Sequence, residues 1–143
     1  MKIAINLEDR EGSFGGGNYF IKSLKNFIKK NNYSFTHSLK DDDIDVILIV
    51  DPRKRHPLKK FSIAEILNYL IFKKSSAVVI HRINECDERK DTIFVNFFLK
   101  LTNLITDHTI FISEWLKSLK VWRNHKRYSV ILNGADSNIF YKN

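Results

Sequence analysis

A glycine-rich stretch near the amino terminus has the residue types needed to bind an anion. Residues 12–18 read Gly-Ser-Phe-Gly-Gly-Gly-Asn and lie between an apolar run at residues 3–7 and a segment with helical spacing. Glycine accepts positive φ and lets a ligand approach the backbone, so this pattern predicts a turn between a strand and a helix. Helix N-termini bind phosphates through their free N–H groups. We therefore expect Gly15, Gly16 and Gly17 to face a phosphate or diphosphate, with a plain tight loop as the alternative.

This stretch matches neither common phosphate-binding motif. It has no Gly-Lys followed by Ser or Thr at the start of the helix, which excludes a P-loop. The dinucleotide pattern Gly-x-Gly-x-x-Gly also fails, because its third glycine cannot be placed. The phosphate interpretation therefore depends on the predicted geometry of strand, turn and helix.

A basic loop follows the predicted strand at residues 45–50. Residues 51–60 contain two prolines and five Lys or Arg side chains. Ligands of open parallel sheets gather at the carboxyl ends of the strands. We expect Arg53 and Arg55 to meet an anionic substrate or acceptor there, and a solvated loop is the alternative.

A second polar segment, residues 81–90, follows the predicted strand at residues 77–80. We expect His81, Arg82 and Glu85 to share the same cleft as the glycines and the basic loop. Because Ile80 should point to the other side of the strand, His81 is predicted to be a neutral side chain at the cleft surface. A histidine buried in the core is the alternative.

No metal or cofactor is predicted. His108 and His125 have no neighbouring ligands at metal-binding spacing, and the single cysteine, Cys86, has no identifiable partner base. One cysteine cannot form an internal disulfide, which favours a reducing cytosol.

Predicted strands alternate with predicted helices along the chain, which indicates an α/β protein with a Rossmann-like open parallel sheet and helices on both faces. A length of 143 residues with 43% apolar residues fits one such domain. The helix at residues 18–30 is expected to bury Phe20, Leu24, Phe27 and Ile28 on one face, and the helix at residues 92–106 is interpreted as core. The predicted strands lie at residues 3–7, 33–38, 45–50, 77–80, 109–112 and 128–132, and the helices at residues 18–30, after Ser62, at 92–106 and from Ser113.

Four stretches together resemble a known family: residues 18–24, 79–85, 111–115 and 130–140. The chain resembles the N-terminal domain of group 1 (family 4) glycosyltransferases, which have the two-domain GT-B fold. The most specific part is Asn-Gly-Ala-Asp-Ser-Asn-Ile-Phe at residues 133–140, because a similar run ends the first domain of that family.

The resemblance implies a retaining enzyme that transfers a sugar from a nucleotide-sugar donor to a sugar or lipid-linked acceptor. It implies that Gly15, Gly16 and Gly17 face the donor diphosphate, that His81 contacts the donor sugar, and that Asn133 and Asp136 are structural. The family's second domain, with its Glu-x7-Glu pair, does not occur in these 143 residues. We therefore expect the chain alone to be inactive and to need a C-terminal domain or a separate partner chain.

The net charge of +8 leaves two other interpretations open. One is a basic module that binds nucleotides or nucleic acid without catalysis, although no nucleic-acid motif is present. The other is peripheral contact with the inner face of a membrane through Lys22, Lys25, Lys29 and Lys30, for which a solvated helix face is the better explanation. No apolar run approaches the length of a membrane span, so a soluble cytoplasmic chain is expected.

Overall fold

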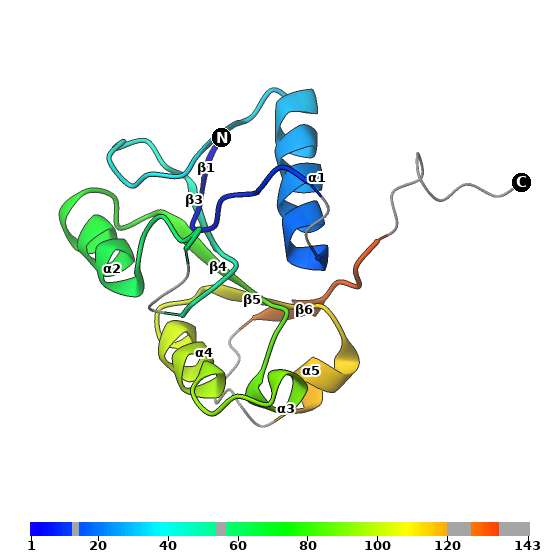
Figure 1. Ribbon diagram of the computed structural model, residues 1–143. Coiled ribbons are helices and arrows are strands. Elements are labelled where there is room, and N and C mark those ends of the chain that lie inside the picture. Colours follow the sequence, from blue (N-terminus) through cyan, green and yellow to red (C-terminus); the bar gives the residue numbers. More distant parts are fainter. Residues whose placement is uncertain (13–14, 54–56, 120–126, 135–143) are drawn as a thin grey trace, which may run out of the picture.

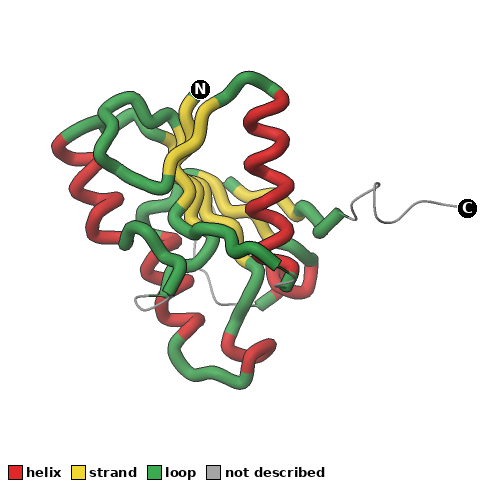
Figure 2. Tube along the Cα trace, turned by 45° about the horizontal axis from the view of Figure 1, so that its top comes forward, coloured by secondary structure: helices red, strands yellow, loops and turns green. Residues whose placement is uncertain are grey.

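The described residues form one open, six-stranded, all-parallel sheet flanked by helices, as predicted (Figures 1 and 2). The structure is a computed structural model that describes residues 1–12, 15–53, 57–119 and 127–134. The strand order is β2-β1-β3-β4-β5-β6. The strands are β1 (Lys2–Ile5), β2 (Ser34–Thr36), β3 (Val46–Ile49), β4 (Val78–Ile83), β5 (His108–Phe111) and β6 (Tyr128–Val130).

The strand order reverses direction at β1 and β3, and this reversal distributes the helices over the two faces of the sheet. The helix between β1 and β2 therefore covers one face, while the helices that follow β3, β4 and β5 cover the other (Figure 1). The helices are α1 (Gly16–Lys30), α2 (Ile63–Phe72), α3 (Asp87–Lys90), α4 (Val95–Asn103) and α5 (Glu114–Ser118). A switch of this kind leaves a crevice at the carboxyl ends of the strands.

The core follows the alternation of side chains along the strands. On the α1 side, Ile80 of β4 packs with Leu48 of β3 and Ile21 of α1. On the opposite side, Val79 packs with Ile66 of α2. Both faces of the central strands are therefore buried, which explains why these strands read as continuous apolar runs rather than as alternating ones.

The start of α2 matches its sequence prediction. Ser62 accepts a hydrogen bond from the Glu65 amide (3.3 Å), and the Glu65 carboxylate accepts one from the Ser62 amide (2.7 Å), which completes a capping box. In α1 the prediction was wrong in two details. The helix begins at Gly16 rather than at residue 18, and Phe27, expected in the core, is exposed.

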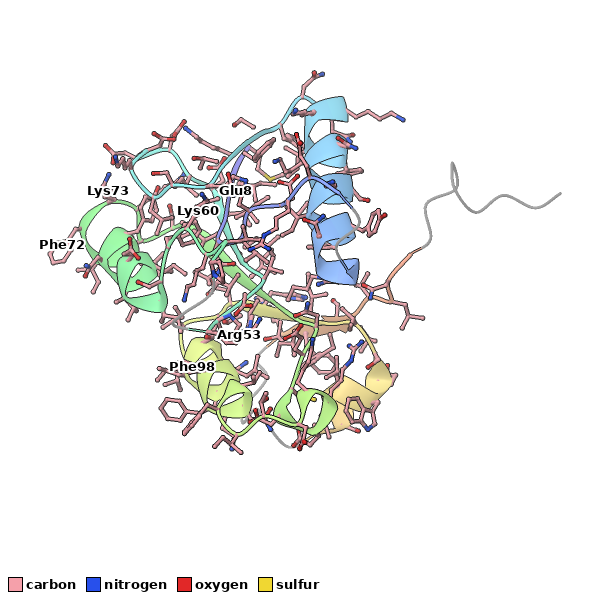
Figure 3. All side chains as sticks on the ribbon, viewed as in Figure 1. Glu8, Arg53, Lys60, Phe72, Lys73 and Phe98 are labelled. Atoms are coloured by element: carbon pink, nitrogen blue, oxygen red, sulfur yellow. The ribbon has the colours of Figure 1, made fainter. Side chains whose placement is uncertain are left out.

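The prediction that the helix at residues 92–106 belongs wholly to the core is also wrong. Val95, Leu99 and Thr102 face inward, but the opposite side of α4 is exposed to solvent. α2 shows the same feature, and Figure 3 shows Phe72 at its end pointing away from the sheet. In the described part of the chain, no helix has the length and apolar character needed to cross a membrane.

Candidate anion-binding pocket

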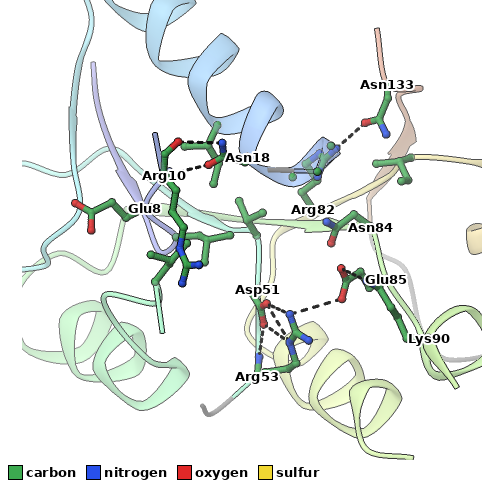
Figure 4. Close-up of a pocket in the computed structure, with 18 of the residues that line it drawn as sticks. Glu8, Arg10, Asn18, Asp51, Arg53, Arg82, Asn84, Glu85, Lys90 and Asn133 are labelled. Atoms are coloured by element: carbon green, nitrogen blue, oxygen red, sulfur yellow. Dashed lines mark hydrogen bonds and ion pairs between the residues drawn. The ribbon is translucent and has the colours of Figure 1, made fainter. Parts of the chain in front are cut away.

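A pocket of about 400 Å³ lies at the carboxyl edge of the sheet, at the point where the strand order reverses (Figure 4). The N-terminal turn of α1 forms one wall, and the segments that follow β3 and β4 form the others. Its charged described side chains are five basic and three acidic ones. They are Arg10, Arg53, Arg82, Arg89 and Lys90, and Glu8, Asp51 and Glu85.

The N-terminal turn of α1 presents bare backbone to this pocket. The Asn18 amide donates to the Gly15 carbonyl at 3.1 Å, but neither an acidic residue in the first turn nor a side-chain cap satisfies the amides of Gly16 and Gly17. The partial positive charge of the helix N-terminus is therefore left uncompensated on this wall. An anion in the pocket would be attracted to it.

The space in front of this turn is open at Gly15 and Gly16. A Cβ atom built at either position meets no other atom within 4 Å, and one at Gly17 meets only Asn84 Nδ2 at 3.7 Å. The positive φ expected of the glycine run occurs at Gly12 instead, where φ is 97°. Internal packing does not require glycine at 16 and 17, so what glycine provides there is open space next to the helix amides.

Arg82 lies under the α1 N-terminus and is 3% exposed. Its guanidinium carbon sits 3.8 Å from the centroid of the Phe20 ring of α1, and Nη2 donates to Asn133 Oδ1 at 2.7 Å. Buried Nη1 has no hydrogen-bond partner among the described residues. Burial lowers the pKa of Arg82 to about 10, which still leaves it charged at neutral pH.

None of the three pocket carboxylates forms an ion pair with Arg82 in the described part of the chain. Asp51 and Glu85 both pair with Arg53, and Glu8 pairs with Lys60. A buried charge without a counter-ion is costly unless a ligand supplies the opposite charge. Arg82 is therefore the side chain in this pocket that is most in need of an anion.

The opposite wall is a compensated ion network. The Asp51 carboxylate accepts hydrogen bonds from the Arg53 amide (2.9 Å) and from Arg53 Nε (3.0 Å), and this pairing raises the pKa of Arg53. Glu85 lies 3.6 Å from Arg53 Nη2 and 3.3 Å from Lys90 Nζ. Carboxylates held in this way can accept hydrogen bonds from the hydroxyl groups of a neutral ligand.

Two asparagines that the sequence analysis did not single out position the pocket loops. Buried Asn6 accepts from the Val50 amide (2.8 Å) and donates to the Asp51 carbonyl (2.7 Å), which joins the ends of β1 and β3. Asn18 accepts from the Arg10 amide (2.7 Å) and donates to the Arg10 carbonyl (3.1 Å). The sequence feature that could have pointed to Asn6 is a polar residue directly after the apolar run of β1.

His81 does not lie at the cleft surface, and that prediction is corrected. The side chain is fully buried, neither ring nitrogen has a partner among the described residues, and it does not line the pocket. Ile80 does point to the α1 side, but the other side of β4 is covered by helices and is not open to solvent. Burial lowers the pKa of His81 to about 3, so the ring is neutral.

The other predicted site residues divide into two groups. Gly15, Gly16, Gly17, Arg53, Arg82 and Glu85 all line the same pocket, whereas Arg55 lies outside the described residues. Cys86 is buried, and burial raises the pKa of its thiol. The structure shows no group of three or more His, Cys, Asp or Glu side chains placed to hold a metal within the ranges that it describes.

Comparison with known proteins found no match to this chain among protein-family models, curated proteins or solved structures.

Proposed function

We propose that this pocket binds the diphosphate of a nucleotide sugar and that the chain is the acceptor-side domain of a sugar transferase. The observation on which the proposal rests is the buried, uncompensated guanidinium of Arg82 beside the glycine turn of α1. The motifs that resemble family 4 glycosyltransferases supply the substrate class.

The two anion-binding groups would act on the same phosphate. Arg82 Nη1 is an unused donor on one side, and the amides of Gly16 and Gly17 are donors on another. Hydrogen bonds from a charged donor to a phosphate are about twice as strong as neutral ones. A diphosphate in this position would satisfy the buried charge and the helix N-terminus together.

The ion network on the opposite wall suits the sugar or the acceptor. Asp51 and Glu85 present carboxylate oxygens that Arg53 holds in place. Sugar hydroxyl groups donate to such oxygens without requiring an additional charge. In this proposal the chain orients the substrates, while a C-terminal domain or partner chain holds the nucleotide.

The chain alone should bind a nucleotide sugar or pyrophosphate weakly, with a Kd of about 1 mM, because one phosphate group makes few contacts. We therefore expect no sugar transfer from UDP- or GDP-sugars by the isolated chain. Binding is the property to measure first.

The test is an NMR titration of the ¹⁵N-labelled chain with inorganic pyrophosphate at constant ionic strength. The proposal predicts that the amide resonances of Gly16 and Gly17 and the side-chain resonance of Arg82 shift together with one saturation curve. Shifts confined to exposed lysines would contradict it.

A parallel titration with a single-stranded oligonucleotide distinguishes the proposed sugar-transferase domain from a module that binds nucleic acid, which is the alternative interpretation of the sequence. A nucleic-acid module would bind the oligonucleotide more tightly than pyrophosphate and would lose affinity steeply with added salt. In the proposed function, pyrophosphate competes with a nucleotide sugar for the same resonances, and the oligonucleotide does not displace it.

A further inference from the structure

One phosphate of the diphosphate has its donors in Arg82 and in the first turn of α1, so the second phosphate needs contacts elsewhere in the pocket. Among the other lining residues, Asp51 and Glu85 carry carboxylates that would repel a second phosphate. Asn84 and Arg89 also line the pocket, and their side chains carry N–H donors and no negative charge. The second phosphate is therefore attracted to the side of the pocket that Asn84 and Arg89 form.

The side chain of Asn84 adjoins the N-terminal turn of α1. Its Nδ2 lies 3.7 Å from the position that a Cβ atom would occupy at Gly17. The backbone carbonyl of Asn84 accepts a hydrogen bond from Arg89, but its side-chain amide forms none with another described residue. Because Asn84 is only half-buried, its NH₂ group is available to a ligand that already contacts the amide of Gly17.

Arg89 lies next to Asn84 at the rim of the pocket and is exposed. Arg89 Nη1 donates to the Asn84 carbonyl at 2.9 Å, which holds the guanidinium beside that residue. The neighbouring carboxylate, Glu85, pairs with Arg53 and Lys90, and Arg89 forms no ion pair in the described part of the chain. A guanidinium has five N–H donors in a planar fork, so Arg89 keeps donors for a phosphate.

We propose that Asn84 and Arg89 bind the second phosphate of the diphosphate and make the pocket select two linked phosphates over one. This inference rests on the proposed function and assigns the outer half of its anion site. Arg82 and the α1 amides hold the inner phosphate, and Asn84, beside Gly17, lies where the two phosphates join. A single inorganic phosphate uses the inner donors and leaves Arg89 without a ligand.

Arg10 is the alternative cation for the second phosphate, because it lines the same pocket and also adjoins the start of α1. Its backbone forms two hydrogen bonds with the side chain of Asn18. The amide of Asn18 is therefore already used, unlike that of Asn84. Glu8, two residues before Arg10, adds a carboxylate to that side of the pocket. Both differences favour the side of Asn84 and Arg89.

The affinities of the ¹⁵N-labelled chain for inorganic phosphate and for pyrophosphate test the inference, measured by NMR titration at one pH and constant ionic strength. Arg89→Gln removes the outer guanidinium, and Asn84→Ala removes the amide but keeps the carbonyl that holds Arg89. Arg10→Gln is the matched control, because it makes the same substitution at another exposed arginine of the pocket. All three variants should keep the thermal unfolding midpoint of the parent chain, since none of these side chains is buried.

We expect the parent chain to bind pyrophosphate about tenfold more tightly than phosphate, and Arg89→Gln and Asn84→Ala each to lower this ratio to about threefold. Arg10→Gln should leave the ratio near that of the parent. In the parent chain, both anions should shift the amide resonances of Gly16 and Gly17. Only pyrophosphate should also shift the side-chain amide resonance of Asn84.

Two results would overturn this inference and leave the proposed function standing, provided that Gly16 and Gly17 still respond to both anions. One is equal affinity of the parent chain for phosphate and pyrophosphate. The other is a ratio that Arg10→Gln lowers as much as Arg89→Gln does, or more, which would assign the second phosphate to net charge or to Arg10. Anions that leave Gly16 and Gly17 unaffected would overturn the proposed function and this inference together.

Discussion

Arg82 and His81 are neighbours on β4, and both are buried polar side chains without a full set of hydrogen bonds. They point to opposite faces of the sheet. Arg82 faces the α1 side, where a pocket adjoins it, whereas His81 faces the side covered by α2 and α4 and does not line that pocket. The two side chains are therefore buried to a similar degree, but only Arg82 argues for a binding site.

The difference between Arg82 and His81 shows under which conditions a buried polar group without hydrogen-bond partners indicates a ligand-binding site. Arg82 keeps its charge at neutral pH, and the room beside it would admit an anion. His81 avoids the cost of a buried charge by staying neutral. A buried polar group without hydrogen-bond partners therefore indicates a ligand only where the group is charged and lies beside open space.

The largest expected effect comes from Arg82→Met. Methionine keeps an apolar stem against Phe20 but removes the charge, so pyrophosphate should bind about a hundredfold more weakly, equivalent to about 2.7 kcal/mol. The thermal unfolding midpoint should stay the same or rise, because a buried unpaired charge is lost. Calorimetric titration and thermal melts measure the two quantities.

Lys30→Gln is the matched control for this variant, since Lys30 is an exposed cation at the far end of α1. If both variants weaken pyrophosphate binding equally, the effect is one of net charge and the comparison between Arg82 and His81 breaks down.

His81→Leu should alter stability and leave binding unchanged. The unfolded chain takes up a proton at His81 with a pKa near 6.5, but the folded chain does so only near a pKa of about 3. Between these values the unfolded state binds more protons, so stability falls as the pH falls, by about 2 kcal/mol from pH 7 to pH 5. Urea unfolding across this range should show that loss in the parent chain and not in the variant.

An unchanged acid dependence in His81→Leu would show that His81 does not resist protonation in the fold. A large fall in pyrophosphate affinity would instead return His81 to the binding site, where the sequence analysis had placed it.

Gly16→Ala should separate the role of open space from that of local flexibility. Its Cβ has room in the free chain, so we expect helix stability to rise by roughly 0.5 kcal/mol. The same methyl group would occupy the space next to the helix amides and weaken pyrophosphate binding about tenfold. Stability and affinity moving in opposite directions would support the pocket, whereas unchanged affinity would argue for a plain loop.

The smallest effect is expected from Asn133→Ala. Asn133 holds Arg82 Nη2 but leaves Nη1 to the ligand. Its removal should weaken pyrophosphate binding about threefold, because the guanidinium loses one positioning contact. A loss as large as that of Arg82→Met, measured by the same titration, would place Asn133 itself in the binding site.

The positions of the strands and helices along the chain could be predicted from the sequence, because apolar runs, β-branched residues and capping residues act locally. The same rules brought Gly16, Arg53 and Arg82 to one edge. They failed for His81, since alternation along a strand says which side a residue faces but not whether that side is covered. The rules failed for α4 for a related reason. An apolar residue on the solvent side of a helix can have the same spacing along the chain as one on the core side, so spacing does not show which residues are buried.

The hydrogen-bonded pairs within the pocket could not be predicted from the sequence either. Asp51 was not singled out, yet it fixes Arg53, and Asn6 joins two strand ends that are far apart in the chain. Such contacts depend on loop geometry that spacing alone does not determine.

A crystal structure of the chain soaked with pyrophosphate tests the central claim most directly. The account predicts a phosphate group within hydrogen-bond distance of Arg82 Nη1 and of the amide nitrogens of Gly16 and Gly17. A pyrophosphate bound elsewhere, or an Arg82 guanidinium paired with a protein carboxylate while the pocket stays free of phosphate, would contradict it.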